Sequence, residues 1–393
     1  MAVVLITDPE QRAALAAARS LARDGKQVIT VGRSRGLAGA SRAVRRSIVL
    51  PDADVADPER FREAMRAAVV ATGASVVVPV TDGTSRALLG HEAQLGAVIA
   101  GPSADAYERA SNKALLMELA PRCGLVAPAQ AVASVRSELE SAADQVGYPL
   151  VLKPARSIVD VDGVPARVGV RFVDRPDELA SAGDRYPPAA YPLLVQSRAI
   201  GDGLGVFLLR VGGRVVLRFG HRRLREKPPA GGVSTYREAV APPAELLDAC
   251  ERLLQLLEYD GPAMVELKED RERGRVVLME INARLWGSVQ LAIDAGVDFP
   301  AMLVRSALGE PIPEAPSARL GTRTYWELGE VDHALALARR SRAALHLPSG
   351  TAVGVGAALR SVLDRRWQDH PEVWRWSDPG PFFSELMAWI RGQ

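Results

Sequence analysis

The 393-residue sequence has little of several features that mark common classes of protein. It contains two cysteines, Cys123 and Cys250, outside any spaced motif, which argues against a disulfide framework and against a zinc site. No apolar run approaches the roughly 18 residues that a membrane helix requires. The formal net charge is only +2, so global electrostatics give no reason to expect nucleic acid or an anionic membrane as a partner. Any basic site must therefore be local.

The N-terminus also lacks the features of a signal peptide. Its apolar run, AVVLI, is short and has no basic segment before it, so we expect a first β-strand here instead. The scarcity of cysteine fits a reducing compartment. These features together predict a cytoplasmic protein.

A glycine-rich turn is missing from the first hundred residues, although their pattern otherwise fits a nucleotide-binding fold. Strand-like and helix-like segments alternate there, in the order 2–7, 10–25, 27–32, 57–73 and 75–80. This alternation predicts a parallel sheet with right-handed crossovers. The turn after the first strand reads TDPEQR and lacks the G-x-G-x-x-G fingerprint. We therefore predict a Rossmann-like domain over residues 1–108 that does not hold a dinucleotide.

The rest of the chain has a different pattern. Segments at 191–199, 205–213 and 214–226 read as strands joined by short turns, which predicts antiparallel pairing. From about residue 310 the sequence becomes rich in alanine and arginine with helical spacing, so residues 311–393 are predicted to form a helical C-terminal extension. The expected fold class is thus α/β followed by α+β.

Two further segments are predicted to form a hairpin across a polar loop, namely PAMVELK at 262–268 and RVVLMEI at 275–281. Side chains alternate between the two faces of a strand. Val277, Met279 and Ile281 would therefore share one apolar face of the second strand. The opposite face carries the polar groups.

Glu266 and Glu280 lie directly opposite each other on that polar face if the hairpin closes symmetrically. Opposed carboxylates repel each other, and a hard divalent cation removes this penalty. Asn282 adds an amide oxygen, which gives a partial shell for Mg²⁺ that phosphate and water would complete. The alternative is a solvated strand face, with Arg284 in a salt bridge to Glu280 or another acid. The combination of all four residues favours a metal site.

The pairing of VELK with LMEINARLWGS resembles the metal-binding core of the ATP-grasp superfamily, which includes biotin carboxylases, carbamoyl-phosphate synthetases and many carboxylate–amine ligases. The resemblance covers roughly residues 1–310. The segment HRRLRE…PPAGGVSTYRE is more similar to the carboxylate–amine ligase branch than to biotin carboxylase. The resemblance implies a two-lobed ATP-grasp domain over residues 109–310, with lobes at about 109–194 and 195–310.

The resemblance also implies positions for the nucleotide. Lys113, in SNKALLMEL, and Lys153, which closes the strand LVLKP, match the lysines that contact phosphate. Gln196 matches the hinge position beside the adenine amine. Ser197 and Ala199 would offer backbone contacts to the adenine.

The loop that follows Lys153 departs from the family pattern, because it is poor in glycine. It contains only Gly163 and Gly169, where the superfamily often has a glycine-rich loop that closes over the phosphates. Arg156 and Ser157 could still reach a phosphate group. The departure puts the closing movement in doubt, and not the nucleotide site.

Several arginines are candidates for charge stabilisation or substrate recognition. Arg284 would stabilise the transferring phosphoryl group together with Lys153. In the basic stretch GHRRLREK, alternation sends Arg223 and Arg225 to one face and Arg222 to the other. These three arginines would recognise a substrate carboxylate. The plain alternative is a solvated edge strand.

The resemblance implies an ADP-forming ligase that uses ATP and Mg²⁺, with Mn²⁺ able to substitute. A carboxylate would attack the γ-phosphorus to give an acyl phosphate, which an amine then captures. The expected partners are a small-molecule or peptide carboxylate and an amine, without nucleic acid or membrane, and a homodimer is compatible with this picture. The alternatives are a kinase that phosphorylates a small molecule and a non-catalytic ATP-binding protein.

Overall fold

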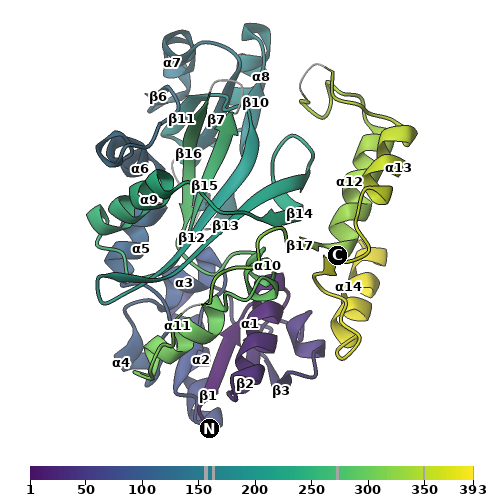
Figure 1. Ribbon diagram of the computed structural model, residues 1–393. Helices are drawn as coiled ribbons and strands as arrows, with labels where there is room; N and C mark the ends of the chain where they lie inside the picture. The colour runs from purple at the N-terminus through teal and green to yellow at the C-terminus, as the bar shows by residue number, and fades with distance from the viewer. Residues whose placement is uncertain (155–157, 162–163, 271–273, 315, 348–349, 393) are drawn as a thin grey trace.

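The computed structural model describes residues 1–154, 158–161, 164–270, 274–314, 316–347 and 350–392. From bottom to top, Figure 1 shows an N-terminal parallel sheet, a long, twisted and mostly antiparallel sheet and a smaller antiparallel sheet. The C-terminal helices lie along one side of this stack. Within the described residues, no helix is both long and apolar enough to cross a membrane.

The N-terminal residues form a parallel sheet, as their alternating pattern predicts. Its strand order is β3-β2-β1-β4-β5, and all neighbouring pairs are parallel. The strands are β1 (Val3–Thr7), β2 (Gln27–Gly32), β3 (Val44–Val49), β4 (Val76–Val78) and β5 (Val98–Ile99). Strand β3 was missing from the sequence prediction, because its sequence VRRSIV carries two exposed arginines and little apolar periodicity.

Helices cover both faces of this sheet, which explains why β1 is almost continuously apolar. Val4 and Ile6 lie in one apolar cluster with the alanine-rich face of α1 (Arg12–Arg23). Leu5 lies in another cluster with Phe61 and Met65 of α2 (Pro58–Thr72). The chain then continues through α3 (Asp82–Leu88), α4 (Glu92–Leu95), α5 (Ala104–Ser111) and α6 (Lys113–Leu119).

The small sheet at the top of Figure 1 is antiparallel, with the order β10-β7-β11-β6. Its strands are β6 (Gln130–Ala133), β7 (Leu150–Pro154), β10 (Arg171–Val173) and β11 (Leu193–Ser197). Its apolar cluster includes Leu150 and Leu152 of β7 together with Leu139 of α7 (Leu139–Val146) and Leu179 of α8 (Leu179–Gly183). A ribbon of β8 (Ile158–Val161) and β9 (Val164–Arg167) follows β7.

The long sheet has the order β16-β15-β12-β13-β14-β17-β18. Its strands are β12 (Asp202–Val211), β13 (Arg214–Lys227), β14 (Val233–Ala239), β15 (Gly261–Asp270), β16 (Arg275–Asn282), β17 (Arg323–Tyr325) and β18 (His370–Pro371). Alternation along β12 divides the core between two faces. Val206 clusters with Leu253 of α9 (Ala244–Leu256), and Phe207 clusters with Trp286 and with Phe299 of α11 (Phe299–Ala307). Helix α10 (Val289–Asp294) packs on the same face as α11.

The C-terminal residues are part of this framework, because β17 and β18 extend the long sheet. The C-terminal helices are α12 (Glu327–Arg339), α13 (Val355–Leu363) and α14 (Gly380–Ile390). Glu372, which follows β18, is buried and forms ion pairs with Arg12 of α1 and Arg237 of β14. Asp378 pairs with Arg19 of α1. The segment after residue 311, predicted to be helical, therefore also supplies strands and ties the first helix to the long sheet.

Candidate functional site

The two carboxylates of the hairpin lie where the sequence predicts them. Glu266 of β15 pairs directly with Glu280 of β16 in the antiparallel register. Both side chains are partly exposed, while Val265 and Leu267 of β15 and Ile281 of β16 are buried in the core. The predicted face-to-face arrangement of the glutamates is confirmed.

The predicted apolar face of β16 is wrong at two of its three positions, Val277 and Met279, and Val277 pairs with Lys268 on the face of Glu266. The register shifts beside Glu266, so that Leu267 pairs with Leu278 and Met279 becomes the extra residue of a β-bulge. A bulge reverses the alternation beyond it. Leu278 is consequently buried in the core, and Met279 is only partly buried. The bulge is also what keeps Glu280 opposite Glu266.

Two lysines face these carboxylates from the other side of the site. Lys113 is the first residue of α6, after the helix cap Asn112, and its Nζ lies 3.1 Å from Oε2 of Glu280. Lys153 lies near the end of β7 and is only 6% exposed. Burial alone would raise the pKa of Glu280, but Lys113 and Lys153 hold that pKa below its usual value. The carboxylate is therefore ionised and ready to bind a cation.

The environment of Lys153 predicts a pH effect on nucleotide binding. Burial, assisted by the charge of Lys113, lowers the pKa of Lys153 to about 8. If Lys153 contacts a nucleotide phosphate, as the sequence predicts, that phosphate favours the protonated lysine, and ATP affinity should fall by up to about tenfold per pH unit above pH 8. Calorimetric titrations with ATP between pH 7 and 9.5 measure this effect, and Lys153→Met should show a weaker and flatter dependence. An unchanged wild-type affinity over that range would contradict the assignment.

Arg223 reaches the metal candidate Glu266 across an intervening strand. Its Nη2 lies 2.7 Å from Oε2 of Glu266, although β12 separates β13 from β15. The reach is possible because residue 203 of β12 is a glycine, where a Cβ would lie 2.6 Å from Cδ of Arg223. Any larger residue at Gly203 would displace the arginine. Arg223 also donates to Glu226 at 2.9 Å.

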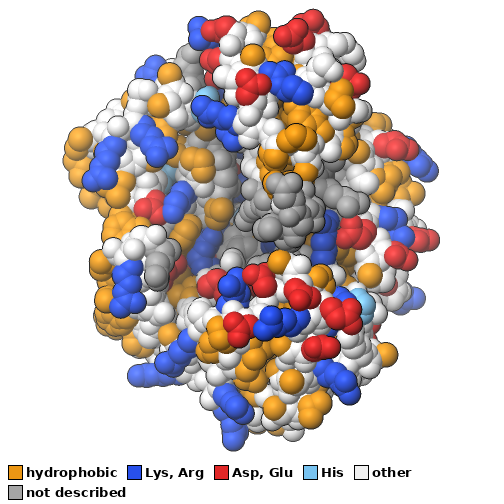
Figure 2. Space-filling view, turned by 180° about the vertical axis from the view of Figure 1, so that it is seen from behind, with side chains coloured by type: hydrophobic (Ala, Val, Ile, Leu, Met, Phe, Trp, Pro, Cys, Tyr) orange, Lys and Arg blue, Asp and Glu red, His pale blue; other side chains and the backbone are white. Residues whose placement is uncertain are grey.

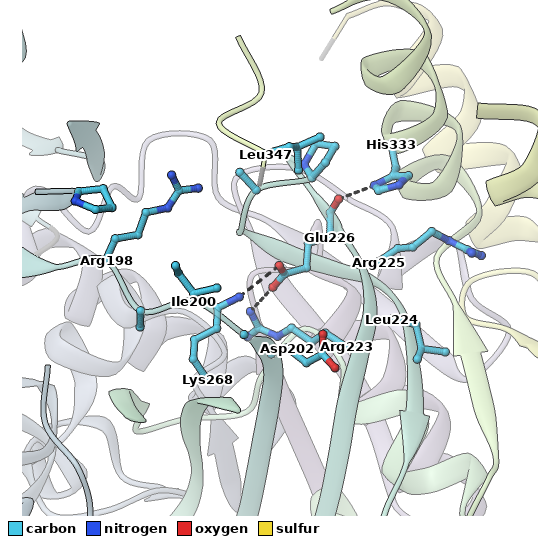
Figure 3. A pocket seen from close by; sticks show the side chains of 16 residues that line it. Arg198, Ile200, Asp202, Arg223, Leu224, Arg225, Glu226, Lys268, His333 and Leu347 are labelled. Carbon is cyan, nitrogen blue, oxygen red and sulfur yellow. Dashed lines mark hydrogen bonds and ion pairs between the residues drawn. The ribbon is translucent and has the colours of Figure 1, made fainter. Parts of the chain in front are cut away.

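One of the three arginines of the basic stretch, Arg225, does not lie on the predicted face. Arg223 pairs with Arg237, whereas Arg225 pairs with Tyr236, the adjacent residue of β14. The register shift places Leu224 in a bulge and turns Arg225 to the face opposite Arg223. Arg225 contacts Glu330 of α12 at 2.6 Å and extends away from Arg223 (Figure 3).

Arg222 is partly buried, and its Nε has no hydrogen-bond partner among the described residues. Of the three arginines, Arg223 is the one that contacts a predicted metal ligand. A role for any of them in substrate recognition stays a prediction.

Arg284 forms the salt bridge that the alternative interpretation anticipated, with an acid at the start of α3. Its Nε and Nη2 each donate to Asp82 of α3 at 3.0 Å, and Tyr107 donates to the same carboxylate at 2.9 Å. Burial would raise the pKa of Asp82, but Arg284 holds it below its usual value. Nη1 donates to the carbonyl of Leu285. Among the described residues, these contacts use three of the five N–H groups of the guanidinium and leave two.

The predicted hinge residues lie at the junction of the small and long sheets. Gln196 is buried and donates to Gln130 at 2.7 Å, and Ser197 ends β11 with its backbone N–H bound to Ala129. Ala199 lines a cavity of about 310 Å³. Lys268 and Glu226 also line that cavity, together with His333 from the C-terminal region. Its volume is in the range of small-molecule sites.

The surface is hollowed between the upper and lower parts of the molecule, and lysine and arginine side chains lie in and around the hollow (Figure 2). Arg156 and Ser157, the loop residues expected to reach phosphate, lie outside the described residues, as does Gly163. The predicted roles of these residues therefore stay predictions.

The donor set fits Mg²⁺ that is shared with a nucleotide. Within the described ranges, no three His, Cys, Asp or Glu side chains are grouped to hold a metal ion by themselves. Glu266 and Glu280 supply hard oxygen ligands. Asn282 follows two residues after Glu280 on the edge strand β16, and its amide nitrogen lies 3.9 Å from Met264 Sδ. Mg²⁺ usually takes one or two carboxylates and completes its shell with phosphate and water. This site has that composition.

Some residues of the site were absent from the sequence prediction. Lys268 shares the face of Glu266, and alternation in VELK would have found it. Glu226 lies within the basic stretch, where its neighbours suggested only a positive surface. Asp82 and His333 come from distant parts of the chain, and no local pattern marks them.

Part of the chain is similar to a known protein family. Residues 193–329 match the family described as ATP-grasp in the biosynthetic pathway with Ter operon. The carbamoyl phosphate synthase large chain of Kocuria rhizophila is 23% identical over 233 residues, which is 56% of this chain and 20% of that protein. This chain spans about a fifth of the length of the curated relatives it matches.

Solved structures show the same fold. The biotin carboxylase of Campylobacter jejuni, in a β,γ-ATP complex, has a TM-score of 0.65 at 18% identity, covering 82% of this chain and 74% of that one. The L-amino acid ligase of Bacillus licheniformis has a TM-score of 0.60 at 20% identity, covering 78% and 74%. The ATP-grasp family match covers residues 193–329, and the fold shared with these solved structures extends over most of the chain.

Proposed function

We propose that this protein is an ADP-forming ligase that joins a carboxylate to an amine with ATP and Mg²⁺. The observation that carries the proposal is the opposed pair Glu266 and Glu280, which faces Lys113 and Lys153 from the other side of the site. Carboxylates alternating with cations complement a metal ion held on a chain of phosphates. The ATP-grasp family match and the shared fold support the same assignment.

The proposed nucleotide position follows from these side chains. The phosphates would lie between Glu280 and the two lysines, and the adenine would lie toward the hinge at Gln196 and Ala199. On this proposal Lys113 exchanges its contact with Glu280 for a phosphate oxygen when the nucleotide binds. Mg²⁺, held by Glu266, Glu280 and Asn282, would neutralise charge on the phosphates.

The proposed reaction has two steps. A substrate carboxylate oxygen attacks the γ-phosphorus, the bond to the β-phosphate oxygen breaks, and ADP leaves. The amine nitrogen then attacks the acyl carbon, loses a proton and expels inorganic phosphate. The side chains act by positioning and charge neutralisation. Lys153 would hold the transferred group, and the two remaining N–H groups of Arg284 would bind the acyl phosphate.

Phosphate release distinguishes this reaction from that of a kinase. We expect the full-length protein to release ADP and phosphate in equal amounts only when both an acid and an amine are present with Mg·ATP. A coupled assay for ADP and phosphate across pairs of carboxylates and amines measures this. ADP without free phosphate, with a phosphorylated product, would show a kinase instead, and the absence of Mg·ATP binding would refute both.

A further inference from the structure

Glu226 is the centre of a chain of charges that ends at the metal candidate Glu266. Arg223 lies between the two carboxylates, with Nη1 2.9 Å from Glu226 and Nη2 2.7 Å from Glu266. Lys268 approaches Glu226 from β15, with Nζ 3.6 Å from Oε2. Figure 3 shows the side chains of Arg223 and Lys268 converging on Glu226 at the edge of the cavity. All three side chains are largely withdrawn from solvent.

The C-terminal helix α12 holds the strand segment that carries Glu226. His333 Nδ1 lies 2.7 Å from the backbone carbonyl of Glu226, and because a carbonyl only accepts, Nδ1 carries the proton. The residues on either side of Glu226 are also bound by α12. Arg225 pairs with Glu330 and Lys227 pairs with Asp332. These contacts fix the bulged end of β13 beside the metal face.

Arg223 and a metal ion would compete for the same carboxylate. A guanidinium that donates to Oε2 of Glu266 at 2.7 Å uses one of its two oxygens and balances its negative charge, so it weakens the attraction of this carboxylate for Mg²⁺. Binding of the metal is therefore linked to what else Arg223 can contact. Glu226 offers that second contact, since it already shares the guanidinium. If the carboxylate of Glu226 is removed, Glu266 is the remaining acid that forms an ion pair with Arg223 among the described residues.

We propose that Glu226 is a positioning residue for the metal site. When Mg²⁺ and nucleotide bind, Arg223 would leave Glu266 and keep only its pair with Glu226. Helix α12 keeps Glu226 in place for this contact, and this gives the C-terminal region a role in the site. The inference rests on the proposed function, because it requires that Glu266 binds the metal of a nucleotide complex. Glu226 itself contacts neither the metal nor the reacting atoms.

The Mg²⁺ dependence of ADP binding tests this role. ADP is titrated into the full-length protein by calorimetry, without Mg²⁺ and at a series of Mg²⁺ concentrations. In Glu226→Gln, half-maximal enhancement of ADP affinity should require about tenfold more Mg²⁺ than in the wild type, because Arg223 now competes fully for Glu266. The affinity for ADP without Mg²⁺ should change less than twofold. Glu226→Asp should fall between the two.

Two further variants distinguish a positioning role of Glu226 from a general loss of order around the site. Glu330→Gln removes one α12 contact, the pair with the neighbouring Arg225, but leaves the His333 contact to the Glu226 carbonyl and the pairs of Arg223 intact. Its Mg²⁺ requirement should therefore stay within about twofold of that of the wild type. In Arg223→Gln combined with Glu226→Gln, the competing cation is gone, and the Mg²⁺ requirement should return to within threefold of the wild type. Melting temperatures show that each variant is folded.

The outcomes are distinguishable. An equal Mg²⁺ requirement in folded Glu226→Gln and wild type overturns the positioning role, while the proposed ligase site stands. The positioning role is also overturned if Glu330→Gln raises the Mg²⁺ requirement as much as Glu226→Gln does, or if the double variant does not recover. The effect of Glu226→Gln would then reflect a general loss of order around the site. If the wild type binds no ADP with or without Mg²⁺, the proposed function falls and the inference falls with it.

Discussion

Replacing Glu280 by glutamine is expected to remove the Mg²⁺-dependent part of ATP binding and turnover. The amide cannot supply the charge that balances Mg²⁺, and a metal contact in such a site is worth several kcal/mol. Because each 1.4 kcal/mol corresponds to a factor of ten, the loss of turnover should be about a thousandfold or more. Calorimetry with Mg·ATP and the ADP-release assay measure the two effects.

Glu269→Gln provides the control for this variant. Residue 269 lies on the same strand as Glu266 but three positions away, and therefore on its opposite face. This variant should keep its Mg²⁺ dependence. The melting temperature of Glu280→Gln should stay near that of the wild type, because the lost pair with Lys113 lies at the edge of the site. Full turnover in Glu280→Gln would refute the metal assignment.

Replacing Glu372 by alanine is expected to lower the free energy of unfolding more than any of the other substitutions proposed for this protein. Its carboxylate is buried between Arg12 of α1 and Arg237 of β14, and Arg237 has no exposed surface. Removing one partner of a buried pair leaves an uncompensated charge and costs about 3–5 kcal/mol. Urea denaturation measures the change in unfolding free energy. The exposed pair of Arg109 with Glu258 provides the control, and Glu258→Ala should cost less than about 1 kcal/mol.

The pH dependence of the unfolding free energy provides a second test of the ion pairs of Glu372. Burial would raise the pKa of Glu372, but Arg12 and Arg237 hold it below the usual value. A lowered pKa in the folded state contributes stability above the unfolded pKa near 4.5, and this contribution is lost as the pH falls through the folded pKa. The wild type should therefore lose more stability below pH 4.5 than Glu372→Ala does. Equal acid sensitivity of the two proteins would show that the pair contributes little.

Local periodicity was sufficient to predict the parallel N-terminal sheet and the alternation that separates Glu266 from the buried Val265 and Leu267. Both depend on patterns within a few residues, which the backbone geometry of strands and helices imposes. The bulges at Met279 and Leu224 could not be predicted in this way, because a bulge arises from the pairing of two strands. The opposition of Glu266 and Glu280 depends on the first of these bulges, and the bulges are also why Val277, Met279 and Arg225 lie on faces other than those expected.

Partners distant in sequence were equally inaccessible. Asp82 meets Arg284 across 202 positions, and Arg12 meets Glu372 across 360. Nothing in either local sequence indicates the other member of the pair. The contribution of the C-terminal region to the long sheet was missed for the same reason, since β17 and β18 are short and take their form from strands elsewhere in the chain.

The position of the metal ion would show whether Glu266 and Glu280 bind Mg²⁺. Crystals of the protein grown with ADP and Mn²⁺, which substitutes for Mg²⁺ and scatters anomalously, would locate it. We expect an anomalous peak between Glu266 and Glu280, within coordination distance of both carboxylates and of a phosphate oxygen of ADP. Bound ADP with no peak at these carboxylates, or with the metal held by other residues, would contradict it.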